Sequence, residues 1–97
     1  GGGLADNIAR VIPKNHCANI NLKKVKTLKI FKWLKNTGIG DDEMLKTFNC
    51  GIGFCLIINS KNKKKIIKSF KKEFQPYEIG KITKDIKKVK LSGKICW

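Results

Sequence analysis

The order of apolar and polar positions predicts short helices and strands in the first half of the chain. Apolar residues at helical spacing indicate a helix over residues 4–11, which a proline ends. Apolar and polar residues then alternate over residues 17–22, as in a half-buried strand. Helical spacing returns over residues 27–36, where Thr27 is the expected cap, and over residues 41–47, where Asp41 is the expected cap.

The second half contains the longest apolar run, at residues 51–59. A continuous apolar run of strand length predicts a central strand covered on both faces. Residues 60–73 predict the most basic helix, with its lysines in water and an apolar stripe on the core. That stripe consists of Ile66, Ile67, Phe70 and Phe74. After Pro76, two further strands are expected over residues 77–82 and 86–91.

This order of elements, α-β-α-α-β-α-β-β, predicts an α+β fold with a mixed or antiparallel sheet and helices packed on it. A length of 97 residues leaves room for one domain. No apolar stretch reaches the roughly 20 residues of a membrane-spanning helix, so we expect no membrane partner. The chain does not begin with methionine, and its only methionine is Met44, which suggests part of a longer polypeptide.

The net charge of +15 first suggests a polyanionic partner. Arg10 is, however, the only arginine among the 22 basic residues. Proteins recognise base edges and phosphates preferentially with arginine, because its planar guanidinium donates hydrogen bonds in pairs. A lysine-rich nucleic-acid-binding module therefore stays as the alternative, and we favour a solvated lysine surface.

The four cysteines are Cys17, Cys50, Cys55 and Cys96. Their spacing offers no close ligand pair, so no zinc site is predicted. Cys55 lies in the apolar run and Cys50 directly precedes it. In such surroundings a free cysteine behaves as a small apolar residue. We expect core thiols rather than a disulfide framework, and hence a reducing compartment such as the cytoplasm.

Three glycines, Gly1, Gly2 and Gly3, stand immediately before the first predicted helix. Glycine lets a ligand approach the backbone closely, and the first amides of a helix attract an anion such as a phosphate monoester. Asn7 and Arg10 follow one helical turn apart on the polar face, where an arginine can clamp a phosphate. From these residues alone, a flexible linker and a solvated arginine remain alternatives.

A second stretch, Thr47-Phe48-Asn49-Cys50-Gly51-Ile52-Gly53, opens the predicted central strand. Glycines weaken a strand, and they are typical of places where a ligand or another backbone comes close. Asn49 can offer both a donor and an acceptor there. The alternative is a β-bulge capped by the asparagine.

The acidic run Asp41-Asp42-Glu43 begins a predicted helix, and the helix dipole explains it more simply than a metal does. The chain has no nucleophile elbow, no cluster of metal ligands and no complete phosphate loop. Taken alone, it contains no catalytic set.

Several segments resemble one enzyme family. Residues 1–13, GGGLADNIARVIP, resemble the GGGxxENIPRxLP segment of aminoimidazole ribonucleotide synthetase, also called phosphoribosylformylglycinamidine cyclo-ligase. Residues 30–53 match the family's IFxWLQxxG…EMxxTFNxGIG in order and spacing, and Ile79-Gly80 match its closing IG strand. The TFNxGIG segment, residues 47–53, separates this family from relatives such as selenophosphate synthetase.

The resemblance covers the chain from residue 1 to about residue 91. The departures are Asp6 where the family has glutamate, Ala9 where it has proline, and residues 26–29, where it has prolines. These positions lie at helix starts and leave the family pattern recognisable.

The resemblance implies that residues 1–97 are a fragment of the C-terminal, substrate-side domain, with the N-terminal ATP-binding domain absent from this chain. The full enzyme would use ATP and Mg²⁺, bound mainly outside this fragment, to activate the formyl oxygen of formylglycinamidine ribonucleotide. Ring closure would then release phosphate and form aminoimidazole ribonucleotide in purine biosynthesis. The implied partners are the ribotide substrate, the enzyme's own N-terminal domain and a second subunit in a homodimer.

The same resemblance favours a phosphate-binding role for the glycine run over a linker. It assigns no catalytic residue and no metal ligand to this chain, and we expect the fragment alone to be inactive. The expected substrate- and phosphate-binding residues are Gly1, Gly2, Gly3, Asn7, Arg10, Asn49 and Gly51.

Overall fold

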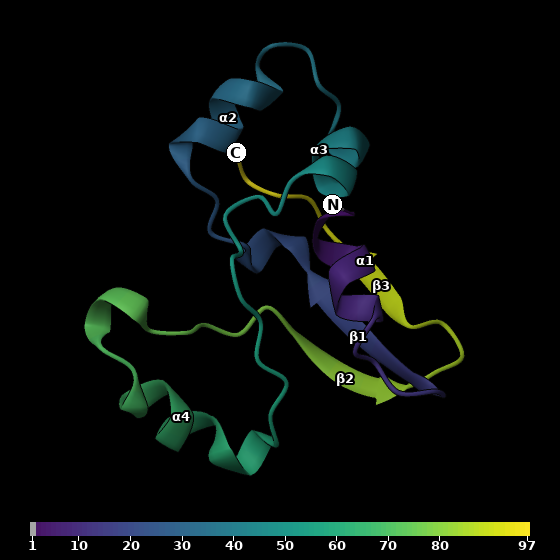
Figure 1. Cartoon of the computed structure of the whole chain (residues 1–97), viewed down its shortest axis with the longest axis vertical. Helices are drawn as coiled ribbons and strands as arrows, with labels where there is room; N and C mark the ends of the chain where they lie inside the picture. The colour runs from purple at the N-terminus through teal and green to yellow at the C-terminus, as the bar shows by residue number, and fades with distance from the viewer. Residues whose placement is uncertain (1) are drawn as a thin grey trace.

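A small mixed sheet positions the other elements of the computed structural model, which describes residues 2–97 (Figure 1). The central strand is β1 (His16–Asn21). It pairs antiparallel with β2 (Gly80–Lys84) and parallel with β3 (Val89–Ser92), in the order β2-β1-β3. Strands distant in sequence therefore meet on β1, and the predicted mixed sheet is confirmed.

The helices are short. The α-helices are α1 (Gly3–Ala9), α2 (Lys29–Lys35), α3 (Asp41–Thr47) and α4 (Lys63–Ser69). Single 3₁₀ turns occur at η1 (Leu22–Lys24), η2 (Ser60–Asn62) and η3 (Lys72–Phe74). With helices and a mixed sheet in one chain, the fold class is α+β, as the sequence predicted.

The core lies where α1 and α3 pack beside the sheet (Figure 1). Met44 of α3 is fully buried, because α3 turns that side chain toward α1 and β1. Ala18 and Ile20 point to the same side from β1, since alternate residues of a strand share a face. The other buried apolar residues of this cluster are Leu4, Ile8, Ile12, Leu22, Val25, Cys50 and Ile95.

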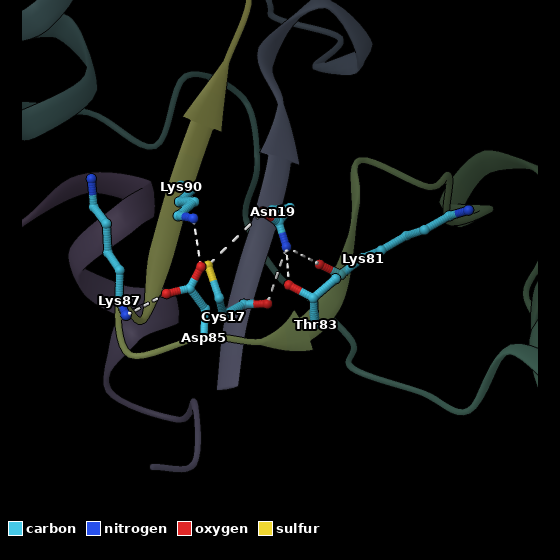
Figure 2. A network of polar contacts seen from close by, with 7 residues as sticks. All are labelled: Cys17, Asn19, Lys81, Thr83, Asp85, Lys87 and Lys90. Atoms are coloured by element: carbon cyan, nitrogen blue, oxygen red, sulfur yellow. Dashed lines mark hydrogen bonds and ion pairs between the residues drawn. The ribbon is translucent and has the colours of Figure 1, made fainter. Parts of the chain in front are cut away.

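The opposite face of the sheet is polar (Figure 2). The amide nitrogen of Asn19 donates to Thr83 Oγ1 at 2.6 Å, across the β1–β2 pair. Asp85, in the turn between β2 and β3, accepts from the Lys87 backbone and forms an ion pair with Lys90. The first contact joins β1 to β2, and the other two fix the turn after β2 and its connection to β3, on the side that no helix of the core covers.

Residues 51–59 do not form the predicted central strand. They run from the end of α3 to η2 without strand pairing, and Phe54 is 85% exposed. The prediction was wrong because apolar composition gives a strand only where a neighbouring strand supplies ladder hydrogen bonds, and none lies beside this segment within residues 2–97.

The basic helix is also shorter than predicted. α4 ends at Ser69, whose hydroxyl donates to the Ile66 carbonyl at 2.7 Å, and Phe70 is already extended. The expected core stripe is not buried: Ile66 and Ile67 are half-buried, and Phe74 is 70% exposed. Without the central strand, α4 has no sheet face to cover.

Smaller differences concern element ends. Thr27 does not cap α2: the N-cap is Leu28, and the buried Thr27 hydroxyl has no hydrogen-bond partner among the described residues. The two late strands are shifted toward the C-terminus of the predicted ranges, to β2 and β3. The helix predicted up to residue 47 forms, but its N-cap is Gly40, and Asp41, the predicted cap, is its first helical residue.

The chain exposes more surface than a closed domain of its size. Its accessible surface is 7474 Å², whereas a folded protein of 11.0 kDa exposes about 5,600 Å². Its radius of gyration is 14.0 Å, against about 12.5 Å for a compact chain of this length. All lysines are exposed except the half-buried Lys35. None of the helices within residues 2–97 has the length and apolar character that a membrane span requires.

Candidate functional site

The glycine run precedes α1, and Gly1 lies outside the described residues. Gly2 is the N-cap of α1 with a φ of +100°, a left-handed conformation that side-chain-bearing residues rarely adopt. A Cβ atom at Gly2 would lie 3.1 Å from Asp6 Cβ and 3.6 Å from Arg10 Nη2. The guanidinium of Arg10 therefore reaches back along α1 toward the glycine run, where the sequence predicts a phosphate.

Gly3 has a packing role. It is buried with a φ of +68°, and a Cβ atom there would lie 1.9 Å from the Leu45 carbonyl oxygen. Only glycine lets the start of α1 approach the α3 backbone this closely. The prediction of ligand access at Gly3 stays open, but its missing side chain is explained by the α1–α3 contact.

Asn7 and Arg10 lie together on the exposed face of α1. Arg10 Nη1 donates to Asn7 Oδ1 at 3.2 Å, and Asn7 Nδ2 donates to the Gly3 carbonyl at 2.5 Å. These two hydrogen bonds connect the guanidinium to the backbone of the glycine run. The other terminal nitrogen, Nη2, lies on the Gly2 side together with the Asp6 carboxylate. A guanidinium held at one edge in this way can still donate to an anion with its remaining N–H groups.

The Asn49 segment forms a capped turn rather than a strand mouth. Asn49 Oδ1 accepts from the Gly51 backbone N–H at 2.9 Å, and Cys50 and Gly51 both have positive φ values, of 54° and 99°. A Cβ atom at Gly51 would lie 3.1 Å from the Lys26 carbonyl oxygen. Gly51 therefore allows residues 26–28 to pass close by, and the asparagine cap considered from the sequence is present, without a β-bulge.

Cys50 anchors this turn. Its buried Sγ lies 3.7 Å from both the Met44 and the Phe48 carbonyl oxygens, which share its single S–H donor, so the turn is attached to the end of α3. Burial raises the pKa of the Cys50 thiol, which keeps it neutral. The sequence predicted Cys50 to be a core residue but not this anchoring role, which depends on where α3 ends.

The structure brings the two predicted stretches near each other through α3. Because Gly3 touches the backbone of Leu45 and Lys46, and Asn49 follows within a few residues, the Gly3 and Asn49 α-carbons lie no more than about 15 Å apart. The corresponding limit for Gly2 is about 18 Å. This is within the roughly 20 Å that a shared site requires, while the ligand roles of these residues stay predictions.

Two residues of the acidic run, Asp41 and Glu43, form contacts that stabilise α3 and its surroundings. Asp41 forms an ion pair with Lys35 at 3.1 Å and accepts from Trp97 Nε1, also at 3.1 Å. The hydrogen bond from Lys35 is the main cause that lowers the pKa of Asp41. Glu43 accepts from the Thr47 hydroxyl within the same helix. Within residues 2–97, no three His, Cys, Asp or Glu side chains are close enough to hold a metal ion.

The cysteine prediction holds for two of the four residues. Cys17 and Cys50 are buried free thiols, whereas Cys55 and Cys96 are exposed. Cys55 was expected in the core because the apolar run was expected to be a buried strand. That strand does not form, and the thiol is left at the surface.

Comparisons with known proteins identify the family to which this chain belongs. Residues 1–91 match the family model described as AIR synthase related protein, C-terminal domain. The chain therefore belongs to this family, and the resemblance to aminoimidazole ribonucleotide synthetase is confirmed at the family level. It is also 47% identical over 70 residues to the trifunctional purine biosynthetic protein adenosine-3 of Chironomus tentans. That match covers 71% of this chain and 5% of the relative.

Proposed function

We propose that this chain supplies part of the substrate-binding wall of an ATP-dependent purine-biosynthetic ligase, phosphoribosylformylglycinamidine cyclo-ligase. The observation that carries the proposal is the family match over residues 1–91, which includes every residue of the candidate site. The purine biosynthetic relative supports the same pathway. The substrate would be formylglycinamidine ribonucleotide, a phosphorylated ribotide.

In this proposal Arg10 binds the ribotide phosphate. Its guanidinium offers paired donors to phosphate oxygens, and its hydrogen bond to Asn7 fixes one edge while Nη2 lies near Gly2. Asn7 is a positioning residue, because it connects Arg10 to the Gly3 carbonyl. Gly2 and the backbone before α1 give the phosphate room to approach.

Asn49 would orient the amidine or formyl group of the ribotide. Its Oδ1 is occupied by the Gly51 N–H, so the amide nitrogen is the part of the side chain that it would offer to substrate. Gly51 keeps residues 26–28 close to this turn and thereby helps to fix the direction of Asn49.

The resemblance further implies ATP, Mg²⁺, an N-terminal ATP-binding domain of the same polypeptide, a homodimer and a cytoplasmic enzyme. The residues described here do not fit a Mg²⁺ site, because no three His, Cys, Asp or Glu side chains within residues 2–97 lie close enough to share an ion. Two carboxylates of the acidic run also have partners, Asp41 with Lys35 and Trp97, and Glu43 with Thr47. We therefore derive no step through the metal or the nucleotide from this chain.

The test uses the full-length enzyme and steady-state kinetics. Arg10→Ala should raise the KM for the ribotide at least tenfold and leave the KM for ATP within twofold. Lys14→Ala removes an exposed cation just beyond the same helix and serves as the matched control. An unchanged ribotide KM in Arg10→Ala would contradict the clamp.

Asn49→Asp separates the two roles of Asn49. Aspartate keeps an oxygen acceptor for the Gly51 N–H, so the turn and the Tm should be preserved, but it loses the amide donor. The proposal expects a raised ribotide KM with an unchanged ATP KM. If Asn49→Asp behaves like the parent and only Asn49→Ala loses stability, Asn49 is a turn cap and not a substrate residue.

A further inference from the structure

Two oppositely charged side chains of α1 lie beside the turn at Gly2. A Cβ atom at Gly2 would lie 3.2 Å from Asp6 Oδ2 and 3.6 Å from Arg10 Nη2. Both distances start from one point, so their sum, about 6.8 Å, is the largest possible separation of the two atoms, which belong to side chains one helical turn apart. A carboxylate oxygen and a guanidinium nitrogen are therefore close neighbours at this turn.

Asp6 and Arg10 nevertheless do not form an ion pair. An acidic residue four positions before a basic one is the order that favours a direct contact on a helix surface. The ion pairs among residues 2–97 do not include Asp6, and Arg10 Nη1 donates instead to Asn7 Oδ1 at 3.2 Å. A gap therefore separates the exposed Asp6 carboxylate from Arg10 Nη2.

Gly2 keeps the approach to this gap open. A side chain at Gly2 would begin 3.1 Å from Asp6 Cβ and would occupy the space next to both charged groups. The φ of +100° at Gly2 excludes most side chains as well. The gap is thus bounded by two side chains and a glycine, and it does not depend on the first amides of α1.

A single hydroxyl group can bridge a gap of this size. Its oxygen accepts from a guanidinium N–H at about 2.9 Å and its proton is donated to a carboxylate oxygen at about 2.7 Å, so it spans up to about 5.6 Å. An ionised phosphate oxygen only accepts, and the carboxylate of Asp6 repels it. A group that both donates and accepts therefore fits between Asp6 and Arg10 better than an anion does.

Arg10 has enough donors for a hydroxyl and a phosphate together. The guanidinium carries five N–H groups, and Asn7 accepts from one of them. An N–H of Nη2 can therefore donate into the gap while the others bind a phosphate on the side away from Asp6. In a ribotide the ring hydroxyl nearest the 5′-phosphate is the 3′-hydroxyl, because only C4′ separates C3′ from C5′.

We propose that Asp6 and Arg10 hold the ribose 3′-hydroxyl of the ribotide between them, and that Asp6 makes the enzyme specific for a ribotide that carries this hydroxyl. Asp6 accepts a hydrogen bond from the hydroxyl, and Arg10 Nη2 donates one to its oxygen. The inference rests on the proposed function, because the ribotide is the substrate named there. It adds a residue, Asp6, and a part of the substrate, the ribose, to that site.

The test compares two substrates of the full-length enzyme, formylglycinamidine ribonucleotide and its 3′-deoxy analogue. The parent should use the analogue with a kcat/KM at least about tenfold lower, because the analogue leaves Asp6 without its hydrogen bond. Asp6→Ala should lower kcat/KM for the ribotide at least about tenfold and change that for the analogue by less than about twofold. A loss of folded enzyme would lower both values equally, so their ratio isolates the contact.

Two further variants support this comparison. Asp6→Asn keeps the size of the side chain and loses its charge, so the preference for the ribotide should fall at least about threefold. Asp42→Ala is the matched control. Asp42 is also an exposed acidic residue in the first turn of a helix, but it lines a different cavity, beside Trp97. Its variant should keep the parent preference within about twofold.

Two results would overturn the inference. One is a parent enzyme that uses the ribotide and its 3′-deoxy analogue equally well, and the other is an Asp6→Ala enzyme with the parent preference. Arg10→Ala separates this failure from a failure of the proposed function. If Arg10→Ala raises the ribotide KM while Asp6→Ala keeps the parent preference, only the 3′-hydroxyl contact is wrong. If Arg10→Ala leaves the ribotide KM unchanged as well, the proposed role of α1 in substrate binding fails with it.

Discussion

The two halves of this molecule differ in burial although both are rich in apolar residues. Among the described residues, every buried apolar side chain except Ile95 lies between residues 4 and 50. Residues 54–58 form the most continuous apolar run, and yet all five are exposed. Apolar composition alone therefore does not bury a segment. α1 packs on α3, and β1 pairs with two strands, whereas residues 54–58 have no strand partner among the described residues.

The largest expected contrast is in stability. Met44→Ala removes a side chain with no exposed surface and should lower the free energy of unfolding by about 2–5 kcal/mol, through lost burial and a cavity. Ile57→Ala, in the uncovered half, should change it by less than about 0.5 kcal/mol. Urea unfolding followed by circular dichroism measures both. Equal losses would mean that residues 53–58 are packed after all.

A smaller effect is expected from the contact between α1 and α3. Gly3→Ala should cost about 1–3 kcal/mol, because the new methyl group collides with the Leu45 carbonyl and the backbone must move. Gly40→Ala is the matched control: a Cβ atom there meets nothing within 4 Å, and its φ of −70° suits any residue. If the two variants have the same Tm, the close contact between α1 and α3 at Gly3 is contradicted.

The rate of reaction with a thiol reagent should differ between the exposed and the buried cysteines. Cys55 and Cys96 are exposed and should react with a thiol reagent in the native state. Cys17 and Cys50 are buried and should react only as fast as the core opens. Mass spectrometry of partially labelled protein assigns the sites. Rapid labelling of Cys50 would contradict the anchored turn at the end of α3.

The smallest expected effect is a pH dependence due to Cys50. Burial raises its pKa above the ordinary value of 9.0, so the neutral thiol is favoured in the folded state. Its contribution to stability is fully present below the unfolded-state pKa. It is lost as the pH rises from that value through the folded-state pKa, because the unfolded chain ionises first. The free energy of unfolding, measured at intervals from pH 7 to 10, should therefore decrease more steeply with pH for the parent than for Cys50→Ala.

Sequence patterns were sufficient to predict an element where its capping and spacing signals lie within the element and its packing partners are present in the chain. The α3 helix was predicted to within one residue at its start, because its three acidic residues suit a helix start and Met44 and Leu45 face the core. β1 was found from its alternation, since one face meets the core and the other carries Asn19 in a polar network.

The same reasoning failed where burial depends on a partner surface. The apolar run at residues 51–59 predicts a strand, but no strand lies beside it, and α4 in turn has nothing to cover. In the candidate site, the sequence predicted Asn7, Arg10 and Asn49 as a set. It did not predict that Gly3 is required by the Leu45 backbone, because that contact depends on how two helices cross.

The most direct test of the contrast between the two halves is native-state hydrogen exchange of the 97-residue chain, read by mass spectrometry. We expect the amides of residues 53–58 to exchange at rates near those of an unstructured peptide, because they have no hydrogen-bond partner within the described chain. The amides of β1 and α3 should be protected at least a hundredfold. Equal protection of residues 53–58 and β1 would contradict the account, because it would require a strand pairing that this structure lacks.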